Sequence, residues 1–167
     1  MKNKIYLGFG SNIGDRRANI IAGLSFLQSC GFVDILRCSS FYETSAVGKK
    51  QKDFINAAAE AATSLSAKEL LSHVKQAERL LGRKVSFRRG PRLIDIDIFF
   101  YGSLVLNSKK PYLSIPHKEI QNRLFALMPL AEIAPDFIHP VFNMKIERIL
   151  EVKKLTLALQ KVKIIRI

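Results

Sequence analysis

Apolar residues recur along this chain at two spacings, one typical of strands and one typical of helices. Residues 5–10 form a short apolar run that predicts a buried strand. The segment that opens at Gly14 and Asp15 predicts an amphipathic helix that ends at Gly31. Its apolar face consists of Ile20, Leu24 and Leu27. Residues 33–42 are rich in β-branched and aromatic side chains and predict a second strand.

Residues 54–63 support two interpretations. Their alanines favour a helix by intrinsic propensity. The segment is short, however, and a clear helix start follows it directly. We therefore expect a third strand here, preceded by a polar loop over residues 48–53.

A second helix begins with the pattern of a capping box, formed by Ser66 and Glu69. Gly82 ends this helix. Its apolar residues fall on one face, and they are Leu70, Val74, Ala77 and Leu81. The spacing predicts an amphipathic helix over this segment.

Residues 94–101 show the period-two pattern of a strand with one core face. The expected core face consists of Ile94, Ile96, Ile98 and Phe100, and the other face of Asp95, Asp97, Phe99 and Tyr101. A third helix is expected near residues 121–133. The order of strand, helix, two strands, helix, strand and helix matches an α+β fold on a ferredoxin-like plan.

With 167 residues and 48% hydrophobic composition, the chain is expected to form one domain, 1–167. Its formal net charge of +13 favours an anionic partner, which leaves nucleic acid, a nucleotide and an anionic lipid open. The densest basic cluster consists of Arg83, Lys84, Arg88, Arg89 and Arg92. The basic tail, residues 152–167, is either a packing helix or a C-terminal extension.

Two features bear on the cellular compartment. No apolar run is long enough to span a membrane, and the N-terminus lacks the hydrophobic region of a signal peptide. Cys30 and Cys38 lack CxxC spacing and are too few for a disulfide framework. We therefore expect a cytoplasmic protein with reduced cysteines.

Asp95 and Asp97 are the sharpest candidates for chemistry. Alternate residues of a strand point the same way, so the two carboxylates are expected on one face, roughly 7 Å apart. Mg²⁺ takes one or two protein carboxylates and completes its shell with water and phosphate oxygens. The pair therefore predicts a magnesium site, and the alternative is the solvent face of an amphipathic strand.

An arginine-rich loop, residues 88–92, lies directly before this acidic pair. Guanidinium groups bind phosphate oxygens in bidentate geometry. Phosphoryl-type transfer requires such arginines together with metal-binding acids, because it depends on positioning and charge neutralisation and needs no protein nucleophile. A solvated basic loop is the alternative.

Three other motifs bear on which nucleotide site and which catalytic residues the chain has. The glycines of residues 8–14 do not match the spacing of the dinucleotide-binding fingerprint and are better explained by a tight turn. Residues 48–50 lack the features of a Walker motif, so an ATP site must be built differently from a P-loop. His117 has no metal-ligand spacing and is either catalytic or an ordinary surface or core residue.

Six blocks in order along nearly the whole chain resemble the 6-hydroxymethyl-7,8-dihydropterin pyrophosphokinases of folate synthesis. The blocks are residues 7–14 (LGFGSNIG), 39–44 (SSFYET), 53–57 (DFINA), 90–97 (GPRLIDID), 115–117 (IPH) and 123–135 (RLFALMPLAEIAP). One block could arise by chance, but six in order are hard to explain otherwise. The resemblance favours the metal interpretation of Asp95 and Asp97.

The resemblance implies a ferredoxin-like three-layer α/β/α sandwich with a mainly antiparallel sheet. It also implies ATP as co-substrate and two Mg²⁺ ions held by Asp95 and Asp97 together with ATP phosphates. The pterin hydroxymethyl oxygen would attack the β-phosphorus of ATP, and AMP would leave. The expected partners are these two small molecules, without nucleic acid or membrane, and a monomer is expected.

Individual roles follow from the same resemblance. Asn56 would hydrogen-bond the pterin edge, and Phe125 would stack on its ring. The other residues of the pterin site would be Thr44, Val47 and Phe54. Arg83 and Arg92 would assist the transfer beside the two aspartates. The remaining nucleotide contacts would be Glu78, Arg88, His117 and Arg123.

Two rival functions remain open from the residues themselves. A ferredoxin-like RNA-binding module would suit the charge and the fold plan, but the aromatic-basic strand motif of such modules is missing. Asp95 and Asp97 would also repel an RNA backbone unless they held a metal. A kinase that transfers the γ-phosphoryl group would use the same acids and arginines, and only its products would distinguish it.

Overall fold

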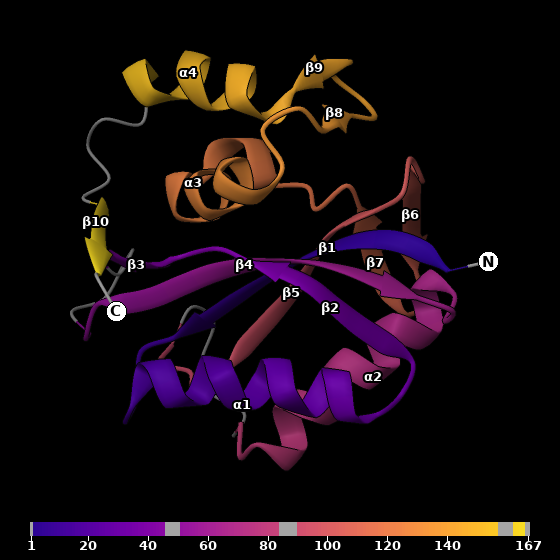
Figure 1. Cartoon of the computed structure of the whole chain (residues 1–167), viewed down its shortest axis with the longest axis vertical. Coiled ribbons are helices and arrows are strands. Elements are labelled where there is room, and N and C mark those ends of the chain that lie inside the picture. The colour runs from indigo at the N-terminus through magenta and orange to yellow at the C-terminus, as the bar shows by residue number, and fades with distance from the viewer. Residues whose placement is uncertain (1, 46–50, 84–89, 157–161, 166–167) are drawn as a thin grey trace.

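The computed structural model describes residues 2–45, 51–83, 90–156 and 162–165. A twisted sheet lies between two helical layers (Figure 1). Helices α1 (Arg16–Ser29) and α2 (Ala67–Leu80) cover one face, and α3 (Leu124–Ile133) covers the other. Helix α4 (Ile146–Thr156) packs on the side of α3 that faces away from the sheet. This arrangement confirms the predicted three-layer α/β/α sandwich.

The main sheet is antiparallel throughout. Its strands are β1 (Asn3–Ser11), β2 (Val33–Cys38), β3 (Phe41–Thr44), β4 (Phe54–Thr63), β5 (Asp95–Tyr101) and β10 (Val162–Ile165). Their order is β10-β3-β4-β1-β5, and β2 also pairs with β4. Two small hairpins lie outside this sheet, β6 (Leu106–Lys109) with β7 (Tyr112–Ile115) and β8 (Ile138–His139) with β9 (Met144–Lys145). The order of the main sheet confirms the ferredoxin-like plan.

The two helices predicted first are confirmed, and so are their ends. Asp15 caps α1 by accepting a hydrogen bond from the Ala18 N–H at 3.0 Å. Ser66 and Glu69 form both halves of the predicted capping box of α2. Gly31 and Gly82 follow the two helices with φ of 75° and 92°, in the left-handed region that glycine tolerates.

The alanine-rich segment is strand β4, as expected. It pairs with β1 along one edge and with β2 and β3 along the other. Ala57 and Ala59 face the core beneath α1 and α2, while Ala58 faces the core beneath α3. Pairing on both edges and burial on both faces outweigh the helix propensity of alanine.

Residues 33–42 form two strands where the pattern predicted one. Both β2 and β3 pair with β4, but one extra residue is inserted between them. At the break, Ser39 Oγ accepts a hydrogen bond from the Ala58 N–H at 2.9 Å. A side-chain oxygen thus replaces a backbone acceptor of the ladder, and hydrophobic periodicity does not report such a replacement.

The predicted alternation of β5 holds through Ile98 and then breaks. Tyr6 of β1 opposes Phe100 and Leu7 opposes Ile98, so Phe99 is an extra residue in β5. This β-bulge reverses the alternation, and the prediction that Phe100 shares the core face of Ile98 is wrong. Phe100 packs instead with Tyr6 in the core on the opposite face.

The third predicted helix is interrupted. A short 3₁₀ helix, η1 (Ile120–Asn122), precedes α3, and Arg123 between them is extended with φ of −128° and ψ of 104°. The prediction of one helix from residue 121 is therefore wrong at its start. The break brings the side chains at the beginning of α3 over the sheet.

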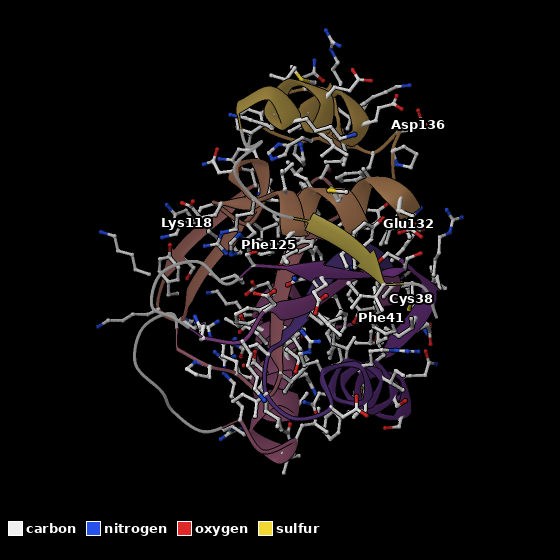
Figure 2. The ribbon with its side chains drawn as sticks, turned by 90° about the vertical axis from the view of Figure 1, so that its left-hand side faces the viewer. Cys38, Phe41, Lys118, Phe125, Glu132 and Asp136 are labelled. Carbon is white, nitrogen blue, oxygen red and sulfur yellow. The ribbon has the colours of Figure 1, made fainter. Side chains whose placement is uncertain are left out.

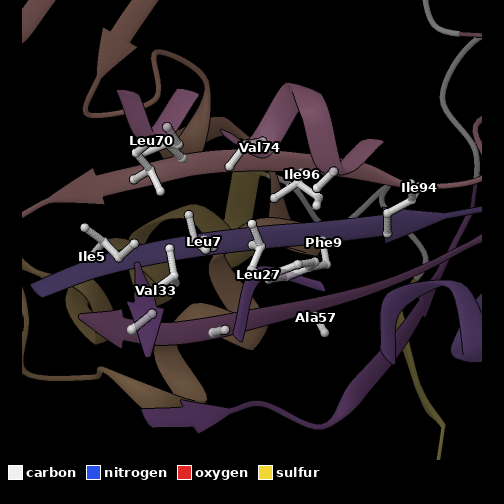
Figure 3. Close-up of a cluster of buried hydrophobic side chains, with 14 of the residues drawn as sticks. Ile5, Leu7, Phe9, Leu27, Val33, Ala57, Leu70, Val74, Ile94 and Ile96 are labelled. Carbon is white, nitrogen blue, oxygen red and sulfur yellow. The ribbon is translucent and has the colours of Figure 1, made fainter. Parts of the chain in front are cut away.

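Two hydrophobic cores hold the layers together. The larger one lies between the sheet and the first two helices, and Figure 3 shows its members from β1 and β5 beside those from α1 and α2. Labelled members include Ile5, Leu7, Leu27, Leu70, Val74 and Ile96. The smaller core joins the sheet to α3 and α4 through Phe100, Leu127, Leu130 and Ile149. Burial of both faces fixes the register of the central strands.

The C-terminal tail joins the sheet. Strand β10 pairs with β3, with Val162 opposite Thr44 and Ile165 opposite Phe41. The basic tail, residues 152–167, thus contributes the end of α4 and an edge strand. No helix among the described residues is long and apolar enough to cross a membrane.

Candidate active site

A cavity of about 470 Å³ opens on the face of the sheet that carries α3. Its floor comes from β1, β4 and β5, and its rim from the segment after β7 and the first turn of α3. Its lining includes Gly8, Gly10, Thr44, Phe54, Asn56, Arg92, Asp95, Asp97, Phe99, His117, Arg123 and Phe125. The cavity thus gathers residues from all six motif blocks and adds Phe99.

The acidic pair lies on the cavity side of β5, while Ile94 and Ile96 point into the opposite core. The predicted placement of Asp95 and Asp97 on one face is therefore confirmed. Asp95 is neutralised within the protein, because Arg83 Nη1 lies 2.8 Å from its Oδ1 and Arg92 pairs with its Oδ2. Two arginines of the basic loop region thus converge on one carboxylate.

Asp97 has a different environment. Its one ion-pair contact among the described residues is His117 Nε2, at 4.0 Å. Burial raises the pKa of Asp97, and the neighbouring Asp95 carboxylate raises it further. A carboxylate that is poorly compensated by protein cations, beside a second carboxylate, favours the binding of an external cation.

His117 is held against the cavity floor by its neighbours. Its N–H donates to the Phe99 carbonyl at 2.9 Å, and its ring meets the Phe99 ring edge-on with centroids 6.4 Å apart. Nδ1 accepts a hydrogen bond from the Glu119 N–H at 3.3 Å, so the proton of the neutral ring is on Nε2, facing Asp97. Burial lowers the pKa of His117, which favours this neutral form.

Glu78 lies behind the acidic pair, outside the cavity lining. Its side chain is 3% exposed, and it accepts from the Ile96 N–H at 2.8 Å and pairs with Lys75 at 3.0 Å and with Arg83. Glu78 therefore anchors β5 and holds Arg83 against Asp95. The structure places Glu78 behind Asp95 and does not bring it to the cavity itself.

The other end of the cavity suits a flat polar ring. Asn56 Nδ2 donates to Thr44 Oγ1 at 2.8 Å, so one amide proton is used within the protein. Asn56 Oδ1 lies beside Gly10, where an added Cβ would be 3.2 Å away. Phe125 faces the cavity from α3, with the Arg123 guanidinium 5.6 Å from its ring centre. An amide and an aromatic face are thus available together.

The remaining predicted positions either do not line the cavity or lie outside the described residues. Val47 and Arg88 lie outside the described residues. Arg83 does not line the cavity, although it reaches Asp95 from behind. The structure shows Thr44, Phe54, Asn56, Arg92, Asp95, Asp97, His117, Arg123 and Phe125 around one space.

The sequence did not single out Asn12, which holds the backbone of the cavity residue Arg92. Its Oδ1 accepts from the Arg92 N–H at 2.7 Å, and its N–H donates to the Arg92 carbonyl at 3.0 Å. Asn12 is only 2% exposed. A buried asparagine directly after a strand was the available indication, but the glycines around it pointed only to a turn.

The donor set fits a hard divalent cation that is shared with substrate. Among the residues that the structure describes, no group of three or more His, Cys, Asp or Glu side chains could hold a metal by itself. Two carboxylate oxygen donors on one strand match Mg²⁺, which completes its shell with water and phosphate oxygens. Asp95 and Asp97 are therefore suited to a metal that enters with a phosphate ligand.

Comparisons with known proteins identify relatives over most of the chain. Residues 6–135 match the model of the 7,8-dihydro-6-hydroxymethylpterin-pyrophosphokinase (HPPK) family. The chain is 41% identical over 140 residues to the 2-amino-4-hydroxy-6-hydroxymethyldihydropteridine pyrophosphokinase of Aquifex aeolicus, covering 83% of this chain and 85% of that protein. The enzyme of the same name from Bacillus subtilis is 40% identical over 134 residues, covering 80% and 79%.

Other relatives are much longer than this chain. The folic acid synthesis protein FOL1 of Dictyostelium discoideum is 41% identical over 147 residues, covering 87% of this chain but 22% of that protein. The crystal structure of Plasmodium falciparum HPPK-DHPS with pterin and p-hydroxybenzoate superposes with a TM-score of 0.74 at 17% identity, covering 95% of this chain and 44% of the other. This similarity supports the fold. On the family match and the sequence identities, the chain belongs to the 7,8-dihydro-6-hydroxymethylpterin-pyrophosphokinase family.

Proposed function

We propose that this chain transfers pyrophosphate from ATP to 6-hydroxymethyl-7,8-dihydropterin, giving AMP and the pterin diphosphate for folate synthesis. The family match supports the reaction type. The observation that carries the proposal is that one cavity joins the Asp95–Asp97 pair to the Asn56–Phe125 site. Both substrates can therefore meet in one space.

The phosphate end of the cavity would bind the triphosphate with its metal. Asp95 and Asp97 would hold Mg²⁺, and we propose two ions, which would neutralise phosphate charge and align the reacting oxygens. Arg83 and Arg92 neutralise Asp95 in the ligand-free protein. If Asp95 held a cation, the two guanidiniums would be available to bind phosphate oxygens in its place.

Two residues at the rim would contact the phosphates directly. Arg123 carries a permanent charge beside the cavity, and neutral His117 presents an Nε2–H donor there. We include Arg88 among the phosphate contacts, and Glu78 as the residue that positions Arg83. Positive charge concentrated at this end stabilises the charge that develops during transfer.

The pterin end would orient the nucleophile. Asn56 would hydrogen-bond the ring edge with its free amide groups, while Phe125 stacks on the ring face. Thr44, Phe54 and Val47 would complete this site. The hydroxymethyl oxygen then forms a bond to the β-phosphorus and loses its proton, and the bond from that phosphorus to the α,β-bridging oxygen breaks. AMP leaves with that oxygen, and no protein nucleophile is needed.

The domain extent, oligomeric state and cellular compartment of the protein are part of the proposal. We take residues 1–167 as one functional unit that acts as a monomer in the cytoplasm. Pairing of β10 with β3 supports a single unit. Cys30 and Cys38 are free, which suits a reducing compartment. Sedimentation of the purified protein, with and without substrates, measures the oligomeric state.

The deciding experiment is product analysis. Purified protein is incubated with ATP and Mg²⁺, with and without 6-hydroxymethyl-7,8-dihydropterin, and the adenine nucleotides are separated by chromatography. Pterin-dependent AMP is the expected result. Pterin-dependent ADP would instead identify γ-phosphoryl transfer, and no turnover would contradict the proposed reaction.

A further inference from the structure

Two sequence blocks meet in space through residues that have no role in the proposed chemistry. One contains Ser40 and Tyr42 in the β2–β3 segment, and the other contains Glu132 at the end of α3. Figure 2 shows Glu132 above Cys38 and Phe41, with Phe125 toward the other end of the same helix. The two blocks are 90 residues apart in the chain and are joined by one carboxylate.

The Glu132 carboxylate accepts hydrogen bonds from three donors on this part of the sheet. Both of its oxygens lie 3.0 Å from the Ser40 N–H, and its Oε1 lies 2.8 Å from Ser40 Oγ. Its Oε2 accepts from the Tyr42 hydroxyl at 2.7 Å. Arg37 adds a parallel contact by donating to the Ile133 carbonyl at 3.0 Å, one of the unpaired carbonyls at the helix end. We call these contacts the Glu132 clasp.

Loss of the Glu132 clasp would leave donors of Tyr42 and Ser40 without an acceptor, which lowers stability. Tyr42 is only 6% exposed, so its hydroxyl would be left buried without this acceptor. Burial raises the pKa of Tyr42, and its hydrogen bond to Glu132 raises it further, so the phenol remains a donor. Ser40 lies in the break between two strands, where its N–H has no place in the ladder with β4.

The clasp connects the two walls of the proposed pterin site. Tyr42 stands directly opposite Asn56 in the pairing of β3 with β4, and Thr44 is two residues further along β3. Phe125 lies in the first turn of α3, and Glu132 lies in its last turn. The distance between the Asn56 amide and the Phe125 ring therefore depends on how α3 is seated on β3.

The helix is weak between its two ends. Pro129 lies inside α3 and has no N–H to donate to the carbonyl of Phe125. The first turn of α3 is therefore held less by the helix itself and more by tertiary contacts. A contact that fixes the far end of α3 constrains the angle at which Phe125 enters the cavity.

From these contacts we infer that Glu132 is a positioning residue for the pterin ring, which sets the spacing between the Phe125 ring and the Asn56 amide. The inference rests on the proposed function. It assigns to Glu132 an effect on the pterin that is separate from its effect on the stability of the fold. ATP binds at the opposite end of the cavity and is expected to be unaffected.

The test compares variants of Glu132 with a stability control. Glu132→Ala removes the clasp, and Glu132→Gln keeps one acceptor oxygen for Ser40. Ser66→Ala is the stability control. It removes the capping box of α2 on the other face of the sheet, and the loss of an N-cap lowers the stability of the fold. For each protein we would measure thermal unfolding, pterin binding at equilibrium by pterin fluorescence, and the KM values for pterin and ATP.

Glu132→Ala is expected to weaken pterin binding and raise the pterin KM by about tenfold, with the KM for ATP unchanged. Glu132→Gln is expected to have a pterin affinity and a pterin KM between those of Glu132→Ala and the wild type. Ser66→Ala should lower the midpoint of thermal unfolding without changing the pterin KM. Adding Tyr42→Phe to Glu132→Ala should have little further effect, because both changes remove the same contact.

Two results would overturn the inference, and they differ in what they say of the proposed function. If the wild type forms pterin-dependent AMP and Glu132→Ala binds pterin as tightly as the wild type, Glu132 is only structural and the reaction stands. If the wild type neither binds pterin nor forms AMP, the proposed function fails and the inference fails with it.

Discussion

Gly8 of β1 lies directly beneath the ring of Phe99 of β5, and a Cβ on Gly8 would be 1.9 Å from the Phe99 Cζ atom. Phe99 is the extra residue of the bulge in β5, so the bulge depends on the glycine at position 8. The ring can cross β1 only because position 8 has no side chain. The Phe99 carbonyl and ring then support His117 at the edge of the cavity.

Replacing Gly8 with alanine is expected to lower the free energy of unfolding by about 1–3 kcal/mol, because the Phe99 ring must leave a packed position. The measurement is chemical denaturation of both proteins. Gly23→Ala is the matched control, since the nearest atoms to its added Cβ lie at 3.5 Å and helix propensity favours alanine. Phe99→Leu should recover part of the loss in a Gly8→Ala background, and a Gly8→Ala protein as stable as the wild type would contradict this packing.

Asp97→Asn is expected to abolish Mg²⁺-dependent turnover while the fold is retained. The amide keeps the shape of the side chain but lacks the charge that a metal requires. The substitution also removes a carboxylate whose pKa is raised by burial and by Asp95, so the metal-free protein should not be destabilised. Turnover at increasing Mg²⁺ and thermal unfolding are the two measurements.

The control for Asp97→Asn is Asp136→Asn, a change at a surface carboxylate that is 75% exposed and does not line the cavity. This control should have normal turnover. Activity of Asp97→Asn at saturating Mg²⁺ would remove the acidic pair from the proposed mechanism.

Asn56→Ala is expected to weaken pterin binding by roughly 1–3 kcal/mol, or about 5- to 150-fold in Kd, which is the range for a lost buried hydrogen bond. Thr44→Val should act in the same direction, because it removes the hydroxyl that accepts the Asn56 amide proton and so fixes the amide orientation. Pterin fluorescence titration without ATP measures the effect. Asn107→Ala, at an exposed position of β6, is the control. Equal pterin affinities for the wild type and all of these variants would show that the pterin binds elsewhere.

His139 predicts a dependence of stability on pH. It is 3% exposed, and its Nδ1 accepts from the Val141 N–H at 3.2 Å and the Phe142 N–H at 3.4 Å. Burial lowers its pKa below the usual 6.5, so the unfolded chain takes up the proton first as pH falls. Stability is therefore full above about pH 6.5 and decreases below it, with a slope of at most about 1.4 kcal/mol per pH unit.

The measurement for His139 is the free energy of unfolding between pH 5 and 8 for the wild type and His139→Gln, with the difference taken at each pH. Subtraction removes the contribution of His117, whose pKa burial also lowers. The difference should shrink as the pH falls. A difference that is constant over this range would show that His139 does not titrate differently in the folded protein.

Local patterns in the sequence were sufficient to predict the ferredoxin-like order of elements, the helix caps and the orientation of the acidic pair. Each depends on residues that are close in the chain. A capping box needs Ser66 and Glu69 three positions apart, and alternate strand residues share a face whatever their partners are. The placement of Asp95 and Asp97 therefore followed from their spacing.

Features that depend on a partner strand or a distant segment were decided only in the tertiary structure. The bulge at Phe99 is the clearest case, since its ring needs the bare backbone of Gly8 on a neighbouring strand. Periodicity carries no information about such pairs, and it placed Phe100 on the wrong face. Asn12 was overlooked for the same reason, because its partner Arg92 is 80 residues away.

The candidate active site also combines features that the sequence predicts with features that only the tertiary structure decides. The sequence by itself determined which residue types were available, two aspartates, several arginines, an amide and an aromatic ring. Only the tertiary structure decided that Asp95 is neutralised by Arg83 and Arg92 while Asp97 is left facing the cavity. The physical reason is that the pKa and the pairing of a charged group depend on distances and burial, which are set when separate segments pack together.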